Sequence, residues 1–409
     1  MKRVTTIGIA GAGAMGAGIA RVAAETGFTV FLLDVNDALV TKAVERIRRA
    51  LSKSVEKGKL SPETMDAILN RINPTSKAED LKAADLVIEA IFEDISAKMD
   101  IFKNLENRCA PDTIFASNTS TLSITGMAAR ITHSDRFVGL HFFNPVPSMR
   151  LVEVIPALQT SADTVAACLA VAKQMRKTAI KVVDCPGFLV NRIFLPYAGE
   201  AMLAAQEGAA LPGDIDAAVK QAGFPMGPLA LNDMVGIDVG VHSFPILYEG
   251  YGDRFPVPIL FKRLADVGRL GLKTNGKGIY NNGKIDEEFH AIIRKIQDET
   301  KVTSAGFSAD RLILRQVNEA VYCLQENVAS PEDIDRAMAL GTGFPCDANG
   351  LGGPLRWADE KGLDWVLAKL NEYKETLGHR FWPHPLLKQY VAAGYLGKKT
   401  RKGFFEYPG

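Results

Sequence analysis

The sequence lacks both a disulfide framework and the cysteine spacing of a zinc site. Its five cysteines are odd in number and scattered, and no two of them form a CxxC pair. Such usage favours a reducing compartment, so we expect a cytoplasmic protein. The six histidines also lack metal-ligand spacing, because Pro383 interrupts the segment between His379 and His384. No metal site is therefore predicted.

Long apolar runs and an excess of charge of one sign are missing as well. No stretch of the sequence approaches the ~20 apolar residues that a membrane-spanning helix requires. Lys and Arg total 48 against 47 Asp and Glu, and the net charge of +1 gives no argument for nucleic acid or an anionic membrane as a partner. With 409 residues, 47% of them hydrophobic, the chain is expected to form a globular protein of two to four domains.

Glycine, by contrast, is concentrated near the N-terminus. The stretch "VTTIGIAGAGAMGAGIARVAAETG" predicts a strand, a tight turn and a helix, with Gly11, Gly13 and Gly16 forming GxGxxG. In this motif the first glycine allows the turn, the second admits a pyrophosphate, and the third lets helix and strand pack closely. The start of the helix offers N–H groups and a positive dipole end to the phosphates. The alternative is that the glycines serve close packing alone.

The next expected strand, "TVFLLD", ends at Asp34, 18 residues after Gly16. An acid at this place can hydrogen-bond the ribose hydroxyls of the cofactor and repels a 2′-phosphate. Val35 and Asn36 follow it and supply no arginine for such a phosphate. The predicted cofactor is therefore NAD rather than NADP.

Further strand candidates follow at the spacing of an α/β fold, at residues 85–91, 113–118, 136–141, 151–155 and 179–183. Continuous Val/Ile/Leu runs that alternate with helical segments predict a mostly parallel sheet covered on both faces. Ligands bind beyond the carboxyl ends of such strands. Glu93, residues 117–120 and His141 are therefore expected on the cofactor side.

His141 and Glu153 lie in "GLHFFNPVPSMRLVEVI", residues 139–155. Nine loop-like residues join the two expected strands, so an antiparallel return would place the start of the second beside the end of the first. A carboxylate near an imidazole fixes its tautomer and stabilises the imidazolium, which makes histidine a competent base. Oxidation of an alcohol needs such a base, because a proton leaves the hydroxyl while a hydride leaves the carbon for nicotinamide. The residues alone leave a structural role for His141 open.

A long helical segment is expected between residues 37 and 59. Arg46, Arg49, Lys53 and Lys57 recur in it every three or four residues and so share one helix face. The sequence leaves two interpretations of this face open, a solvated surface and a binding surface for a phosphorylated substrate.

Four motifs in order, GAGAMGAGIA, FASNTSTLSI, GLHFFNPVPSMRLVEVI and DCPGFLVNRI, closely resemble those of the L-3-hydroxyacyl-CoA dehydrogenases of fatty-acid β-oxidation. The resemblance extends from residue 3 to about residue 285. It implies NAD-dependent oxidation of L-3-hydroxyacyl-CoA to 3-ketoacyl-CoA, with His141 as the catalytic base and Glu153 as its orienting partner. Ser120 and Asn191 would hold the C3 oxygen and the thioester region of the substrate.

The same resemblance implies the ligand contacts. Beside the three glycines, NAD would be contacted by Met15, Asp34, Glu93, Lys98, Ser120 and Asn144. The basic helix falls where family members bind coenzyme A, which implies contacts from Arg49, Lys53 and Lys57. By themselves, the residues would also allow Ser120 to cap a helix beginning near Thr121 and Asn191 to bond backbone at a domain junction.

The C-terminal half of the sequence repeats itself. The segment from Asn191 parallels the one from Asp310 at an offset of 119 residues, so that Glu200 matches Glu319, and residues 270–281 resemble residues 396–407. We therefore predict a Rossmann-type α/β domain over 1–183 that binds NAD, followed by two related all-α domains over 184–285 and 286–409. Asp310 replaces Asn191 in the second copy, which predicts no active site there.

The duplication also bears on assembly and on rival functions. Short family members pair through their helical domains, so a duplicated domain predicts a monomer with an internal pseudo-dimer, with a homodimer as the alternative. The chain begins directly at the dinucleotide fold, so no preceding hydratase domain is expected. A dehydrogenase of a free hydroxy acid such as L-gulonate or carnitine, and a non-catalytic crystallin-like binding protein, remain alternatives. The acyl-chain length is left open.

Overall fold

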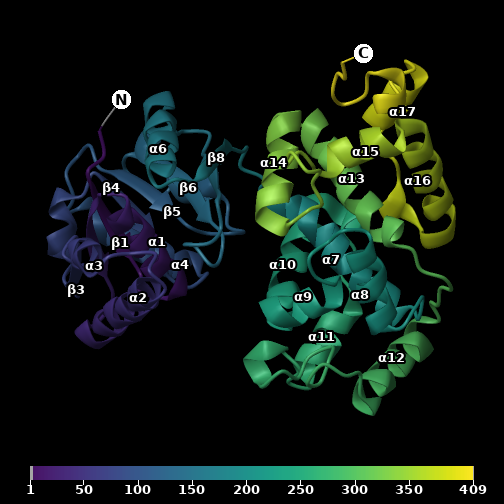
Figure 1. Cartoon of the computed structure of the whole chain (residues 1–409), viewed down its shortest axis with the longest axis horizontal. Helices are drawn as coiled ribbons and strands as arrows, with labels where there is room; N and C mark the ends of the chain where they lie inside the picture. Colours follow the sequence, from purple (N-terminus) through teal and green to yellow (C-terminus); the bar gives the residue numbers. More distant parts are fainter. Residues whose placement is uncertain (1–2, 409) are drawn as a thin grey trace. The chain divides into compact units, whose positions relative to one another are not determined.

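A computed structural model describes residues 3–408, and the chain divides after Phe188 into two compact units. The first unit contains a sheet flanked by helices, and the second is built of helices from α7 onward (Figure 1). The predicted class, an α/β domain followed by all-α structure, is confirmed. The first unit extends beyond the expected end at residue 183, and the three-domain division stays a prediction.

The first unit is organised around one eight-stranded sheet with the order β3-β2-β1-β4-β5-β6-β7-β8. Its strands are β1 (Thr6–Ala10), β2 (Thr29–Leu33), β3 (Ile72–Thr75), β4 (Leu86–Glu89), β5 (Ile114–Ser117), β6 (Phe137–Phe142), β7 (Leu151–Pro156) and β8 (Thr178–Lys181). All neighbouring strands are parallel except β6 and β7, which are antiparallel. The mostly parallel sheet and the antiparallel return after His141 are as predicted.

Helices cover both faces of the sheet. They are α1 (Ala14–Glu25), α2 (Asp37–Glu56), α3 (Pro62–Leu69), α4 (Ile95–Glu106), α5 (Ile124–Ala128) and α6 (Ala162–Gln174), with 3-10 turns η1 (Ala78–Ala83) and η2 (Ser134–Arg136). On one face, Ile9 and Leu140 of the strands share a buried core with Ile19 of α1. On the other face, Phe102 of α4 meets Phe137 edge to face. Alternate strand residues therefore face two different helical layers.

Strand β3 was not expected from the sequence. It pairs with β2 at the edge of the sheet, contains Pro74, and buries only Ile72. Proline cannot donate a hydrogen bond to a ladder and is tolerated at a sheet edge. Because the strand is short and half exposed, it lacks the continuous apolar run that marked the others.

The second unit contains the same series of helices twice. The first series is α7 (Val190–Gln206), α8 (Pro212–Gln221), α9 (Pro228–Val235), α10 (Ile237–Tyr251), η3 (Gly252–Arg254), α11 (Ile259–Asp266) and η4 (Leu272–Thr274). After α12 (Glu287–Thr300), the second is α13 (Ala309–Gln325), α14 (Pro331–Thr342), α15 (Pro354–Lys361), α16 (Leu363–Leu377), η5 (His379–Phe381), α17 (Pro385–Ala392) and η6 (Lys398–Thr400). Helices α7 and α13 pack against each other. The sequence repeat is thus a repeat of structure.

In both copies, a buried aspartate of the second helix accepts hydrogen bonds from the first turn of the third helix. Asp216 accepts hydrogen bonds from the backbone N–H groups of Leu229 and Ala230, at 2.8 and 3.0 Å. Asp335 accepts the corresponding bonds from Leu355 and its neighbour, at 2.8 and 2.9 Å. Such acceptors satisfy the N–H groups that a helix leaves without intrahelical partners.

Within the described residues, none of the helices of either unit is long and apolar enough to cross a membrane.

Candidate active site

The three glycines of the first loop play different parts. A Cβ atom on Gly16 would lie 1.8 Å from the carbonyl oxygen of Gly11, and Gly11 itself has a φ of +111°. A Cβ on Gly13, which caps α1, would meet no heavy atom within 4 Å. Gly11 and Gly16 are therefore required for the turn and the packing, whereas Gly13 leaves open space at a helix N-terminus. This arrangement fits a dinucleotide pyrophosphate.

Asp34 is joined to that loop by hydrogen bonds. It directly follows β2, and its two carboxylate oxygens accept from the backbone N–H groups of Ala12 and Val35, each at 2.7 Å. Because both bonds hold the carboxylate beside the glycine loop, its remaining lone pairs can accept from ribose hydroxyls. Met15, the other predicted contact of this region, lies in the first turn of α1 and is half-buried.

His141 and Glu153 lie directly opposite each other on β6 and β7. The Nδ1 of His141 is 2.7 Å from Oε2 of Glu153, and neither residue is more than 7% exposed. With Nδ1–H donating to the carboxylate, Nε2 is left as the ring atom that can accept a proton. The ring of Phe143 lies 4.4 Å from the imidazole between centroids. The pair has the geometry of an oriented general base.

The loop that carries Ser120 is fixed by Glu93. One oxygen of Glu93 accepts from the hydroxyl of Thr119, from the backbone N–H of Ser120 at 3.1 Å, and from the hydroxyl of Thr121 at 3.1 Å. Helix α5 begins only at Ile124, and Ser123 caps it. Ser120 therefore does not cap that helix.

Lys98 reaches this loop from below the surface. It is 1% exposed and pairs with Glu89 at 2.6 Å and with Glu93 at 3.2 Å. Burial raises the pKa of Glu93, but the Lys98 ammonium and the hydroxyl of Thr119 outweigh it and hold that pKa below its usual value. The contact seen for Lys98 is thus with the carboxylates behind the Ser120 loop, and its contact with NAD stays a prediction.

The two remaining predicted residues lie apart along the chain. Asn144 is exposed in the loop that follows β6. Asn191 is half-buried in the first turn of α7, in the second unit. The structure thus assembles two separate clusters of predicted residues in the first unit. One is the imidazole–carboxylate pair, and the other is the loop held by Glu93. Asn191 belongs to neither cluster, because it lies on α7 in the second unit.

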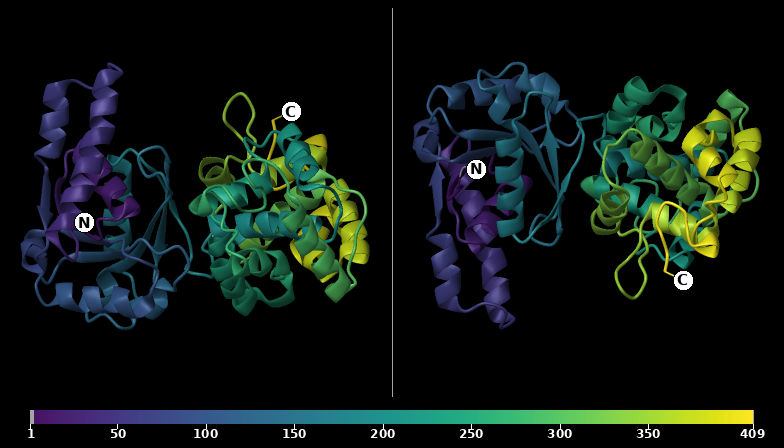
Figure 2. Two further views of the ribbon diagram at one scale, coloured as in Figure 1. Left: turned by 90° about the horizontal axis from the view of Figure 1, so that it is seen from below. Right: turned by 90° about the horizontal axis from the view of Figure 1, so that it is seen from above.

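The basic helix divides into two kinds of residue. Arg46 donates to backbone carbonyl oxygens of the glycine loop. Arg49, Lys53 and Lys57 are exposed, and none of the three forms an ion pair with any other residue in the range 3–408. Figure 2 shows the hairpin of α2 and α3 extending away from the sheet. Three cations on this helix are thus available to an external anion.

An apolar cavity that the sequence did not indicate lies in the second unit. Phe194 and Tyr197 follow Asn191 at intervals of three residues and so continue its stripe along α7. The cavity measures about 190 Å³ and is lined by Phe194, Tyr197, Phe224, Pro225, Met226, Leu231, Met234 and Thr342. Thr342 belongs to the second helical copy. The repeat therefore contributes one wall beside the Asn191 stripe.

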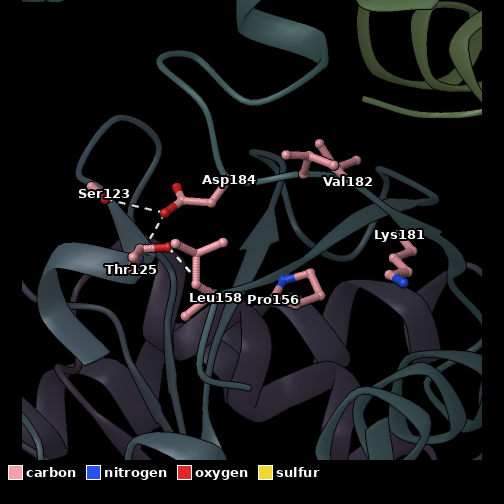
Figure 3. Close-up of a pocket in the computed structure, with 9 residues that line it drawn as sticks. Ser123, Thr125, Pro156, Leu158, Lys181, Val182 and Asp184 are labelled. Carbon is pink, nitrogen blue, oxygen red and sulfur yellow. Dashed lines mark hydrogen bonds between the residues drawn. The ribbon is translucent and has the colours of Figure 1, made fainter. Parts of the chain in front are cut away.

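A cavity of about 400 Å³ in the first unit has Asp184 in its wall (Figure 3). Asp184 accepts from the hydroxyl of Ser123 at 3.1 Å and from the backbone N–H of Thr125 at 2.7 Å, and so ties the chain after β8 to the start of α5. The cavity is lined by Pro156, which pairs with Val138 at the far end of β6 from His141. It therefore does not belong to the imidazole–carboxylate site.

Comparison with known proteins agrees with this geometry. Residues 6–185 match "3-hydroxyacyl-CoA dehydrogenase, NAD binding domain", and residues 187–282 and 306–407 match "3-hydroxyacyl-CoA dehydrogenase, C-terminal domain". The fatty acid oxidation complex subunit alpha of Shewanella amazonensis is 38% identical over 402 residues, which are 96% of this chain and 56% of that protein. The chain thus spans little more than half the length of this curated relative.

Two solved structures match as well. A 3-hydroxybutyryl-CoA dehydrogenase from Escherichia coli is 32% identical with a TM-score of 0.87, over 96% of this chain and 100% of that one. A (S)-3-hydroxybutyryl-CoA dehydrogenase from Ralstonia eutropha is 42% identical with a TM-score of 0.66, over 68% of this chain and 98% of that one. Since both family regions match in order over most of its length, the chain belongs to the 3-hydroxyacyl-CoA dehydrogenase family.

Proposed function

We propose that the protein is an NAD-dependent L-3-hydroxyacyl-CoA dehydrogenase that interconverts L-3-hydroxyacyl-CoA and 3-ketoacyl-CoA. The observation that supports this most directly is the 2.7 Å contact between Nδ1 of His141 and Glu153. In the oxidation, Nε2 of His141 takes the proton of the C3 hydroxyl, and Glu153 stabilises the imidazolium that results. NAD, when bound, supplies the acceptor for the hydride that leaves C3.

Substrate binding, in this proposal, is assigned to the residues that the family resemblance implies. Ser120 and Asn191 bind the C3 oxygen and the thioester region, and the Glu93 hydrogen bonds keep the Ser120 loop in one conformation. The exposed cations Arg49, Lys53 and Lys57 bind the phosphates of coenzyme A, since they have no carboxylate partner within the described part of the chain. Gly13 and Asp34 hold the pyrophosphate and the ribose of NAD.

The acyl chain enters the apolar cavity that continues the Asn191 stripe. Its wall of aromatic and aliphatic side chains suits a hydrocarbon, and a ligand there is partly enclosed by Thr342. At about 190 Å³ the cavity is smaller than the ~300–1,000 Å³ of typical ligand pockets. We therefore infer a preference for short to medium acyl chains.

One comparison of substrates tests the proposal. Acetoacetyl-CoA with NADH should be turned over with loss of NADH absorbance, far faster than free L-gulonate or carnitine is oxidised with NAD. Faster turnover of a free hydroxy acid would instead establish the rival dehydrogenase. Binding of NADH without turnover of any of these substrates would support the non-catalytic alternative. A matched His141→Gln sample shows how much of the signal is the enzyme's own chemistry.

A further inference from the structure

The first turn of α7 directly follows the boundary between the two units at Phe188, and it carries Asn191. Leu189, the N-cap residue, makes no side-chain capping bond to this turn. The orientation of Asn191 therefore depends on the contacts that hold this turn in the fold.

Arg192, the next residue, anchors this turn to the second helical copy. Its side chain is fully buried, and Nε donates to Oε1 of Glu319 at 2.8 Å while Nη1 donates to Oε2 of Glu326 at 2.7 Å. Both glutamates stand on α13 of the second helical copy, Glu326 as its C-terminal cap. The guanidinium also lies over the ring of Tyr251, 4.4 Å from its centroid. A planar guanidinium held by two charge-assisted bonds has little freedom to tilt.

The second helical copy makes the equivalent contact to the first. In the second copy, Nε of Arg311 donates to Oε1 of Glu200 at 2.7 Å, and Nη2 lies 2.7 Å from Oε2 of Glu207. Each of these residues stands 119 positions from its counterpart. Two equal copies thus exchange equal contacts, as the subunits of a twofold dimer do, but within one chain.

The two contacts differ in what lies beside them. Arg192 adjoins Asn191, whereas Arg311 adjoins Asp310. Two ion pairs of nearly the same geometry therefore fix a turn with a substrate-binding amide in one copy and a turn without it in the other. The contact in the second copy can therefore serve as a matched control for the contact beside Asn191.

We propose that Glu319 and Glu326 of the second helical copy are positioning residues for the reaction, which hold Asn191 in place through Arg192. The proposal rests on the proposed function, in which Asn191 binds the thioester region of the substrate. In this proposal neither glutamate contacts the substrate. A displacement of ~1 Å at a positioning group can cost ~10²-fold in rate, which sets the scale of the expected effect.

Glu319→Gln and Glu200→Gln, each made in the full-length protein, are the central comparison. Each glutamate also pairs with a second arginine, Glu200 with Arg380 at 2.8 Å and Glu319 with Arg254 at 3.2 Å, so the two losses should lower the melting temperature by similar amounts. We expect Glu319→Gln to reduce kcat/KM for acetoacetyl-CoA by ~10- to 100-fold with an unchanged KM for NADH. Glu200→Gln should keep kcat/KM near the wild-type value. Equal losses in the two variants would overturn the proposal.

A second measurement shows whether Glu319 acts through Asn191. In an Asn191→Ala background the positioned amide is absent, so adding Glu319→Gln should lower kcat/KM little further. Full additivity of the two changes would overturn the proposal, because a merely structural role predicts it. An Asn191→Ala variant with wild-type kinetics would overturn it too.

Two further arms keep the test decisive. If Glu319→Gln does not fold, Glu326→Gln replaces it, because this side chain is 44% exposed, and Glu207→Gln is its counterpart. The same loss of kcat/KM is expected from Glu326→Gln alone, and its absence would refute the positioning role.

If the wild-type protein turns over a free hydroxy acid but not acyl-CoA, the proposed function fails. The paired variants are then compared on that acid, and unequal losses would still support positioning.

Discussion

The guanidinium of Arg46 donates to the carbonyl oxygens of Gly13, at 2.7 Å, and of Ala12, at 3.1 Å. This links the basic helix α2 to the glycine loop. Of the four cations that share the helix face, Arg46 is therefore engaged in holding the loop. Arg49, Lys53 and Lys57 are the three that can meet the phosphates of coenzyme A.

Reversal of those three charges tests this division. Arg49→Glu, Lys53→Glu and Lys57→Glu in one variant should raise KM for acetoacetyl-CoA, because each change replaces an attraction to phosphate with a repulsion. Added salt should raise the wild-type KM in the same direction. Steady-state kinetics on acetoacetyl-CoA and on a pantetheine thioester without the nucleotide measures the difference.

The truncated thioester is the control, since it lacks the phosphates of the nucleotide and should be affected much less. Equal effects on both substrates would mean that the face is only solvated surface. Arg46→Gln offers a contrast, because it removes the bonds to the glycine loop and should raise KM for NADH instead.

Substitution of the base addresses the chemistry itself. His141→Gln should leave the affinities for NADH and acyl-CoA near their wild-type values while reducing kcat by ~10²–10⁴, the usual contribution of a general acid–base group. Glu153→Gln should also lower kcat, because the imidazolium loses its buried carboxylate at 2.7 Å. Fluorescence titration with NADH alongside kcat measurements separates binding from catalysis. Wild-type kcat in either variant would exclude the assignment.

Asp34 should determine the choice of cofactor. Replacing Asp34 with Ala and Asn36 with Arg removes the repulsion of a 2′-phosphate and adds a partner for it, so the preference should move toward NADPH. Asp34→Ala alone also removes the acceptor of the Ala12 N–H, and it should weaken binding of both cofactors. The ratio of kcat/KM for NADH to that for NADPH is the measurement. A wild-type preference for NADPH would contradict this account of β2.

The parts of the fold that the sequence predicted are those with local signals. The buried strands appeared as continuous apolar runs, and a nine-residue connection was short enough to indicate that His141 and Glu153 return to the same place. β3 had no such run, because a single buried isoleucine at a sheet edge leaves no period to detect. Its pairing with β2 follows from the tertiary structure alone.

Long-range polar contacts were the other part that sequence reasoning missed. Glu93 holds residues that lie 26–28 positions further along, and no local pattern encodes that distance. The pairing of Arg192 with Glu319 did leave a signal. Both residues recur at the offset of the repeat, as Arg311 and Glu200, and a charged residue repeated on two helices of the same kind suggests a reciprocal buried contact. The match of Glu200 to Glu319 was seen, but its ionic partner was not.

The size of the apolar cavity predicts how the enzyme should respond to chain length. Phe194→Ala enlarges the cavity beside Asn191, so kcat/KM should rise for long-chain 3-ketoacyl-CoA relative to acetoacetyl-CoA. Thr342→Phe fills it from the second copy and should reduce activity on medium chains while sparing the four-carbon substrate. A series of thioesters of increasing length measures both effects. Identical chain-length profiles in all three proteins would place the acyl chain elsewhere.

The duplicated helices lead to the last prediction, on assembly. Helix α7 already packs on α13 and exchanges buried ion pairs with it, so this face of α7 is covered within one chain. We therefore expect one particle of about 44.3 kDa by light scattering, with one NAD site. Deletion from residue 301 onward would uncover α7 and leave Arg192 without Glu319, so that protein should dimerise or aggregate.

Asp310→Ala should leave kcat nearly unchanged, because the second copy lacks the amide of Asn191. An obligate dimer joined through α7 would contradict the internal pseudo-dimer, and a large fall in kcat for Asp310→Ala would contradict the inactive second copy.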